Sequence, residues 1–426
     1  MPAHPCFEIP LPNRPIVLGT EQASVRLGSK TLTGPLTATV TMVPRPKLAF
    51  ELEVPPYFGI DISHEAEVTF LSSGVKSPCQ IRRAQMFLQT PSIISLRPLQ
   101  EVVPAGQDMP VNQIVFAVPN FPDFLAHAVI HKSPEGGGTR EDEIRLEFSG
   151  WKVTIRKMTD IAERKELLSE DGGFGITAIG LLERSDAALF TSHDAEPGIE
   201  ALRVFLSFVC GRWTGPMLPA GIGPAGKPIW FRWSVPLVDQ GFSLFTWFDA
   251  HRGMTLSDIV PAFMAKWEDP RWKDALSYAV YWFVRANSAA VGGDGSLILS
   301  QAALEVLSWT YLVTAGGMEP KAFEKLRAAG KIRTLLKAME IPEDIPESLA
   351  RLRAMAADGP GAIVAVRNDL VHPDKREGPL PATEAWTLAQ RYVELVILRL
   401  CGFSGEHANR TKSPRWVGQV ELVPWA

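Results

Sequence analysis

Alternating apolar and polar positions dominate the first third of the chain. Four short segments alternate with period two between prolines and glycines, which favours β-strands: residues 36–42, 48–54, 67–70 and 113–118. Two further segments, 144–148 and 151–156, are joined by Ser149-Gly150 and predict a tight hairpin. No helical pattern separates them, so residues 1–157 are predicted to form a β-rich domain of the sandwich or barrel type.

The pattern becomes mixed between residues 158 and 270. A short helix over 160–169 and a strand over 174–182 are expected, followed by an amphipathic helix over 196–211. The stripe of that helix is formed by Ile199, Leu202, Leu206 and Val209. A loop over 213–228 and an aromatic strand over 229–233 complete an α+β region that is expected to pack on the β-rich domain.

From residue 271 the strand pattern vanishes and helical periodicity takes over. Six helices are predicted, at 274–287, 297–314, 321–339, 346–355, 361–371 and 381–401. Short links rich in Gly and Pro separate several of them, as in an antiparallel bundle. We therefore predict an α+β multidomain protein with an all-α bundle over 271–409 and a basic tail over 410–426 that packs on the bundle or on a partner.

The composition is that of a folded protein with more than one domain. A chain of 426 residues with 46% hydrophobic and 21% charged positions is long enough for two or three folded domains. Its net charge of −4 excludes a wholly basic nucleic-acid coat, so any RNA binding must be local. The four cysteines have no zinc-ligand spacing and are expected to be reduced. No export or membrane signal is found, which predicts a cytoplasmic protein. We expect no metal or cofactor, because no metal-ligand spacing or Walker-type motif stands out.

One stretch suggests chemistry. Arg367 and Asn368 precede His372 near the end of the fifth predicted helix, and Pro373 disfavours α-geometry at His372. Asn368 and His372 are four residues apart and share a helix face, and the long Arg367 side chain is able to reach the same point. The partial negative charge of a helix C-terminus also favours cations there. The trio therefore suits the binding of a phosphodiester.

This arrangement resembles the Arg–polar–spacer–His signature of the HEPN superfamily. The resemblance covers the C-terminal third, and the layout also resembles bacterial proteins with a β-rich region before an ApeA-like HEPN domain. It implies a metal-independent endoribonuclease that cuts RNA through attack by the RNA's own 2′-hydroxyl, with two protomers lining one cleft. It further implies a homodimer and an antiphage-defence or toxin role. The β-rich region would then control activity, with a phage-derived trigger or inhibitor protein as a possible partner.

Within that hypothesis each residue of the trio has a role. His372 acts as general acid or base, Arg367 neutralises charge on the phosphorane, and Asn368 orients His372 or the phosphate. The alternative is helix capping without chemistry, in which Arg and His satisfy the last carbonyl groups of the helix. In that case the bundle is a non-catalytic HEPN module for dimerisation and for binding RNA, a nucleotide or a protein.

Two other groups of residues are candidates in the bundle. Glu305 is a carboxylate in an apolar helix and either pairs with Arg367 or faces water. The helix predicted over 321–339 carries a basic run that either contacts RNA phosphates or is a solvated face. The RNA-binding candidates are Lys321, Lys325, Arg327, Lys331 and Arg333.

Two apparent motifs are set aside. Residues 221–226 fit the letters of GxGxxG, but Pro224 and Pro228 and a following strand exclude the strand–turn–helix context of a dinucleotide site. Asp123, His127 and His131 would align as metal ligands only on a helix, and the sequence after them predicts a strand.

Overall fold

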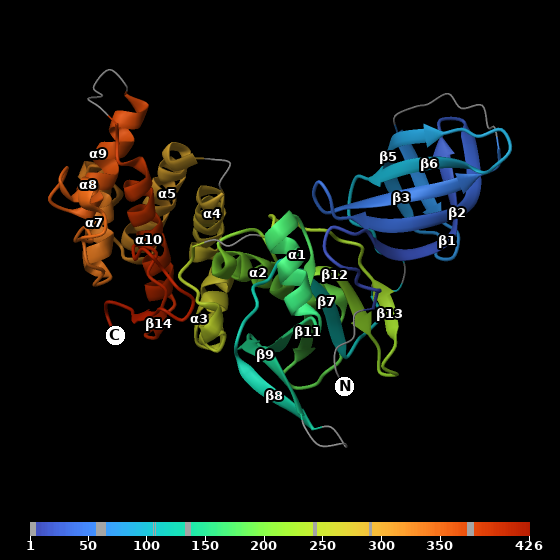
Figure 1. The fold of residues 1–426 in the computed structure, drawn as a ribbon, viewed down its shortest axis with the longest axis horizontal. Coiled ribbons are helices and arrows are strands. Elements are labelled where there is room, and N and C mark those ends of the chain that lie inside the picture. Colours follow the sequence, from blue (N-terminus) through green and yellow to red (C-terminus); the bar gives the residue numbers. More distant parts are fainter. Residues whose placement is uncertain are drawn as a thin grey trace. The chain divides into compact units, whose positions relative to one another are not determined.

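The chain divides into two compact units. The computed structural model describes residues 6–56, 65–104, 106, 108–132, 138–241, 245–288, 292–372 and 379–426 (Figure 1). The first unit comprises Met1–Asp123, Gly150–Glu200 and Thr214–Phe242, and the second comprises Phe124–Ser149, Ala201–Trp213 and Ser243–Ala426. The units are therefore interleaved along the chain. These two units have other bounds than the domain boundaries predicted after residues 157, 270 and 409. The predicted boundaries remain predictions.

A six-stranded closed barrel lies in the first unit, in the order β1-β2-β3-β6-β5-β4. Its strands are β1 (Ile16–Leu27), β2 (Lys30–Thr41), β3 (Lys47–Val54), β4 (Glu65–Phe70), β5 (Lys76–Gln85) and β6 (Ser92–Pro98). The period-two prediction is confirmed for β2, β3 and β4, whose alternate residues are buried. Phe50 and Phe70 fill the interior, and the ring of Trp233 packs edge-on against both at 6.0 and 5.7 Å between centroids.

The same unit contains an antiparallel sheet in the order β13-β12-β7-β11-β10. Its elements are β7 (Gln113–Pro119), β10 (Trp151–Lys157), β11 (Ile176–Arg184), β12 (Met217–Ile222) and β13 (Pro228–Phe231), with helix α1 (Ile161–Asp171) between β10 and β11. The predicted loop over 213–228 was wrong where β12 lies. Every residue of β12 is buried, so it shows no alternation for a sequence reading to detect.

In the second unit, β8 (His127–Lys132) pairs antiparallel with β9 (Gly138–Phe148). The predicted turn after β9 is confirmed. Ser149 and Gly150 both have positive φ, 46° and 77°, as a two-residue type I′ turn requires.

Aromatic side chains pack the middle helices of the second unit. Helix α2 (Ser192–Cys210) is buried on all sides over most of its length after Ala201, and Phe205 and Phe208 contact Phe263 of α3 (Thr255–Glu268). A short 3₁₀ turn, η1 (Ala250–Arg252), precedes α3. Helix α3 was not predicted, and Pro261 inside it interrupts the sequence signal of a helix.

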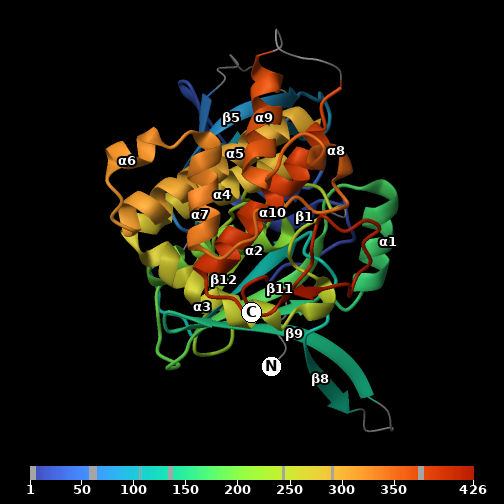
Figure 2. The same ribbon diagram turned by 90° about the vertical axis from the view of Figure 1, so that its left-hand side faces the viewer.

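The C-terminal part is a helical bundle (Figure 2), followed by two short strands that pair with each other. It consists of α4 (Pro270–Asn287), α5 (Gly292–Trp309), the π-helix η2 (Thr310–Ala315), α6 (Pro320–Lys325), α7 (Ala328–Ala338), α8 (Ala350–Arg353), α9 (Gly359–Val371), α10 (Ala382–Leu400), β14 (Glu406–His407) and β15 (Glu421–Leu422). Helices α4, α7, α9 and α10 all pack against α5. The expected helical region is confirmed, although the helix predicted over 346–355 shrinks to α8.

The single helix predicted over 321–339 was wrong. Leu326 and Arg327 are extended, with ψ of 124° and 165°, and they separate α6 from α7. Phe323 and Ile332 are both buried. Nine residues apart, they would lie on opposite faces of one continuous helix, because each residue turns about 100°. The break lets both side chains reach the core.

One stretch, Gly292–Ala315, is long and apolar enough to cross a membrane, with mean hydropathy 1.3 over its best window. Half of that window is buried within the protein. A core helix passes the same test, and α5 packs against four other helices as a core helix does.

Candidate functional site

Helix α9 carries the Arg–Asn–His motif, and its N-terminus is firmly held. The side chain of Asp358 accepts a hydrogen bond from the backbone N–H of Gly361 at 2.7 Å, which caps the helix. Arg333 of α7 donates to the same carboxylate through Nε at 3.0 Å and Nη2 at 2.6 Å. Arg333 also lies 3.4 Å from Glu343. The start of α9 is thereby tied to α7.

Close packing fixes α9 against α10. A Cβ at Gly359 would lie 2.1 Å from the hydroxyl oxygen of Tyr392, so only glycine permits this approach. That hydroxyl donates to the carbonyl of Glu343 at 3.2 Å. Ala362, Ile363 and Val366 are buried on the inner face of α9. The last turn of α9 therefore projects from a rigid base.

Arg367 and Asn368 lie in that last turn. Nη1 of Arg367 donates to Oδ1 of Asn368 at 3.3 Å, so the guanidinium and the amide are in contact. Arg367 is half-buried and Asn368 is exposed. Because Oδ1 accepts this bond, the Asn368 amide nitrogen remains a donor, and the guanidinium uses one of its five donors here.

His372 is the residue that ends α9, as predicted. Its backbone leaves the α-region at φ −126° and ψ 74°, and its N–H donates to the carbonyl of Asn368. The imidazole is exposed. No hydrogen bond or ion pair joins it to Arg367 or Asn368 within the described residues, and Pro373 lies outside them. One chain thus presents a guanidinium paired with an amide, and an exposed imidazole about one turn after that amide.

The second candidate, Glu305, does not pair with Arg367 in the part of the chain that the structure describes. It is half-buried on α5 and accepts a hydrogen bond from Nε2 of Gln301 at 2.9 Å. The i,i+4 spacing places these two side chains on one face of the helix, which provides a nearer partner than the neighbouring helix does.

The basic candidates separate into two groups. Arg333 is engaged with Asp358 and Glu343 and holds α9, and the neighbouring Lys337 lies 3.7 Å from Glu343. Lys321, Lys325 and Arg327 are exposed, and Lys331 lies 4.7 Å above the ring of Phe323. Arg333 thus ties α7 to the start of α9, and the expectation that it also binds RNA stays a prediction.

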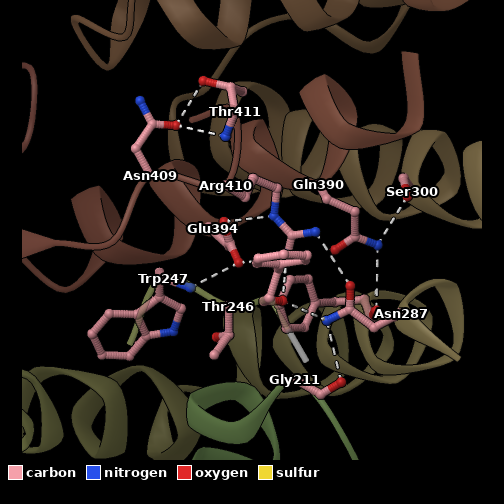
Figure 3. Close-up of polar contacts among 12 residues, drawn as sticks. Gly211, Thr246, Trp247, Asn287, Ser300, Gln390, Glu394, Asn409, Arg410 and Thr411 are labelled. Atoms are coloured by element: carbon pink, nitrogen blue, oxygen red, sulfur yellow. Dashed lines mark hydrogen bonds and ion pairs between the residues drawn. The ribbon is translucent and has the colours of Figure 1, made fainter. Parts of the chain in front are cut away.

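A buried polar network around the middle of α10 was not predicted (Figure 3). Arg410 forms a two-pronged ion pair with Glu394, with Nη2–Oε1 at 2.6 Å and Nε–Oε2 at 3.0 Å, and both side chains are almost wholly buried. The guanidinium also donates to Asn287 and to the carbonyl of Phe245. The backbone N–H of Trp247 donates to Glu394 at 3.0 Å. The network binds the chain after α10 to α4 and α10, and the predicted boundary before residue 410 falls inside it.

A sequence signal for this network exists. Glu394 lies inside the apolar run Tyr392–Val396, where an unpaired carboxylate would be costly. Gln390, one turn earlier, donates to Ser300 at 3.0 Å and to the carbonyl of Phe283 at 3.3 Å. Pairing with a residue of the tail is not visible in the sequence, because Arg410 is one of several basic residues there.

His407 lies next to this network. Its Nδ1 is 3.1 Å from the carbonyl oxygen of Glu421, and the residue is 2% exposed. A carbonyl only accepts, so Nδ1 carries the proton and Nε2 is unprotonated. Burial lowers the pKa of His407 from 6.5 to about 4.

The cysteines and the acidic and histidine side chains offer little support for thiol or metal chemistry. The cysteines are free, and three of them are buried, as expected. Burial raises the pKa of Cys210 and Cys401 to about 12, which keeps both thiols protonated. Among the described residues no group of three His, Cys, Asp or Glu side chains is placed to hold a metal ion. Asp123 pairs instead with Lys157 at 2.9 Å and Lys165 at 3.2 Å.

Comparison with known proteins gives two matching family models. The YopA central domain matches residues 106–243, and the YopA C-terminal domain matches residues 269–422. The second match takes in α4 to β15 and hence the α9 motif and the buried network. The chain is 29% identical over 335 residues to the SPbeta prophage-derived uncharacterized protein YopA of Bacillus subtilis (strain 168), which covers 77% of this chain and 75% of that protein. No solved structure matches the chain.

Proposed function

We propose that the chain is a metal-independent HEPN-type endoribonuclease whose catalytic residues are Arg367, Asn368 and His372. The observation that carries the proposal is the end of α9. A guanidinium in contact with an amide lies about one and a half turns before an exposed imidazole, at the end of a helix fixed at its base. These are the groups that a phosphodiester cleavage by the RNA's own 2′-hydroxyl requires.

The division of labour follows from the chemistry of each group. The imidazole of His372 takes or returns the proton of the 2′-hydroxyl and the leaving oxygen. The guanidinium of Arg367 compensates the charge that develops on the phosphorane, with Asn368 fixing its orientation. One chain supplies one imidazole, so a homodimer that joins two motifs supplies both an acid and a base.

The biological setting is part of the proposal. The relative's printed name calls that protein prophage-derived. A role in conflict between phage and host, with the β-barrel region restraining the nuclease until a phage-derived trigger or inhibitor acts on it, is compatible with that origin. We place this activity in the cytoplasm, where its RNA substrates are found.

A second candidate is a non-catalytic HEPN module for dimerisation and for binding RNA, a nucleotide or a protein. Two observations favour it. His372 ends α9 through its backbone, and its imidazole makes no hydrogen bond or ion pair with Arg367 in the described chain. Arg367 would then serve the helix end alone.

Cleavage assays separate the two candidates. Purified wild type, Arg367→Ala and His372→Ala are incubated with total RNA and a tRNA pool in EDTA, and the ends of the products are analysed. Wild type is expected to cut and leave 2′,3′-cyclic phosphates, and each variant is expected to lose about 10²–10⁴ in rate. His251→Ala is the control, because His251 is also an exposed histidine of the second unit.

Equal cleavage by wild type and both motif variants contradicts the proposal, as does a strict requirement for Mg²⁺. A preparation that cuts no RNA is tested again after removal of the barrel region by limited proteolysis, which relieves restraint by that region. Binding of RNA without cleavage in that form favours the non-catalytic module.

A further inference from the structure

The break between α6 and α7 creates an exposed basic and aromatic surface. We call it the elbow surface and define it by Trp309, Lys321, Lys325, Arg327 and Lys331. We propose that the elbow surface binds single-stranded RNA, with Trp309 stacking on a base and the four cations contacting phosphates. The inference rests on the proposed function for its choice of ligand.

Three of the four cations of the elbow surface are exposed. The side chains of Lys321, Lys325 and Arg327 are exposed and have no ion-pair or hydrogen-bond partner among the described residues. Lys321 and Lys325 are one turn apart and share a face of α6. Arg333 and Lys337, further along the same basic run, are occupied by Asp358 and Glu343. Lys321, Lys325 and Arg327 are therefore able to bind a ligand, whereas Arg333 and Lys337 form ion pairs within the bundle.

The aromatic part contacts one of these cations, Lys331, through Phe323. Trp309, at the end of α5, is 38% exposed, and its ring meets that of Phe323 of α6 at an angle of 85° with 5.2 Å between ring centroids. Lys331 lies over that same Phe323 ring. Aromatic rings within a positively charged region bind single strands without reading their sequence.

The local backbone is also unusual. The π-helix η2 (Thr310–Ala315) starts directly after Trp309 and contacts α6. π-helical turns are rare and are frequently found at functional sites. Here the wider turn ends α5 at Trp309 and leads the chain to α6.

Charge favours a nucleic acid as the occupant. Four cations stand against Glu319 and Glu324 between residues 319 and 331, in a chain with a net charge of −4. A single-stranded polyanion gains affinity by releasing counterions from such a local patch. An acidic protein would use the cations but not the stacking ring, which gives the two occupants different signatures.

Binding is measured with a labelled 2′-O-methyl RNA oligonucleotide, which lacks the attacking hydroxyl and stays intact. Fluorescence anisotropy at several salt concentrations compares wild type with K321Q/K325Q/R327Q. We expect the triple variant to bind at least about tenfold more weakly and the slope of log K against log salt to fall by about 2, because each lost phosphate contact removes about 0.7. The control R45Q/R82Q/R83Q removes the same charge from exposed positions of the barrel and should bind like wild type.

The stacking ring has its own test. Trp309→Leu should lose about tenfold in affinity with an unchanged salt slope, whereas Trp309→Phe keeps a ring and should retain most of the binding. Circular dichroism shows whether each variant is folded.

Three results overturn the proposal: no RNA binding by folded wild type at low salt, equal loss in the two triple variants, or equal binding by Trp309→Leu and Trp309→Phe. None of these depends on catalysis. Intact binding together with absent cleavage would reject the nuclease and leave the elbow surface in place.

Discussion

His407 illustrates what burial does to a single residue. It is neutral, donates from Nδ1 to the Glu421 carbonyl and lies near the cations Arg391 and Arg415, which oppose a second proton. The Glu421 carboxylate raises the pKa of His407, but burial lowers that pKa by more. The folded protein therefore binds a proton at His407 less readily than the unfolded chain does.

This difference predicts a pH dependence of stability. The folded pKa of about 4 lies below the ordinary value of 6.5, so the unfolded chain binds more protons as the pH falls through that window. Stability should fall by about 2 kcal/mol between pH 7 and pH 5 from this group alone. Chemical denaturation at a series of pH values measures it.

The control is His407→Asn, whose amide nitrogen replaces Nδ1 without titrating. Its stability should vary less with pH over the same range. Identical pH profiles for the two proteins would show that His407 is accessible to protons in the folded state.

At the scale of elements, the Arg410–Glu394 pair connects the tail to α10. The side chains are 3% and 2% exposed, so neither charge is solvated if its partner is lost. Hydrogen bonds from Trp247 and to Asn287 and Phe245 satisfy the rest of both groups. The pair therefore anchors the segment after α10 to the bundle.

Breaking this pair should be costly. Glu394→Gln leaves a buried guanidinium without its carboxylate and should reduce the free energy of unfolding by about 3–5 kcal/mol. The double variant Glu394→Leu/Arg410→Met removes both charges and should recover much of that loss. Chemical denaturation provides the measurement.

An exposed pair is the matched control. Arg353 and Glu347, at 57% and 92% exposure, should be worth less than about 1 kcal/mol when Arg353→Met removes the contact. A Glu394→Gln variant as stable as Arg353→Met would mean that the α10–tail pair is not an anchor.

At the scale of the whole molecule, the proposed mechanism calls for two chains. One α9 end supplies one guanidinium and one imidazole, whereas the proposed cleft uses two of each. Light scattering at micromolar concentration should therefore give twice the mass of one chain. A monomer under those conditions contradicts a composite cleft, and the cleavage assay then decides whether a single motif acts alone.

Sequence patterns by themselves determined the local features. Period-two alternation identified β2, β3 and β4 because each strand buries one face, and Ser149-Gly150 identified its turn because Gly150 adopts positive φ without strain. The helix end at His372 followed from Pro373 alone. These features depend on residues close together in the chain, where backbone sterics and side-chain spacing are sufficient.

Only the tertiary structure decided the rest. The fully buried β12, the break between α6 and α7, the role of Arg333 and the Glu394–Arg410 pair all depend on contacts between distant residues. So does the interleaving of the two units. Burial removes the polar–apolar contrast that a sequence pattern needs, and the choice of ion-pair partner is made by packing, which brings one basic side chain among many to one carboxylate.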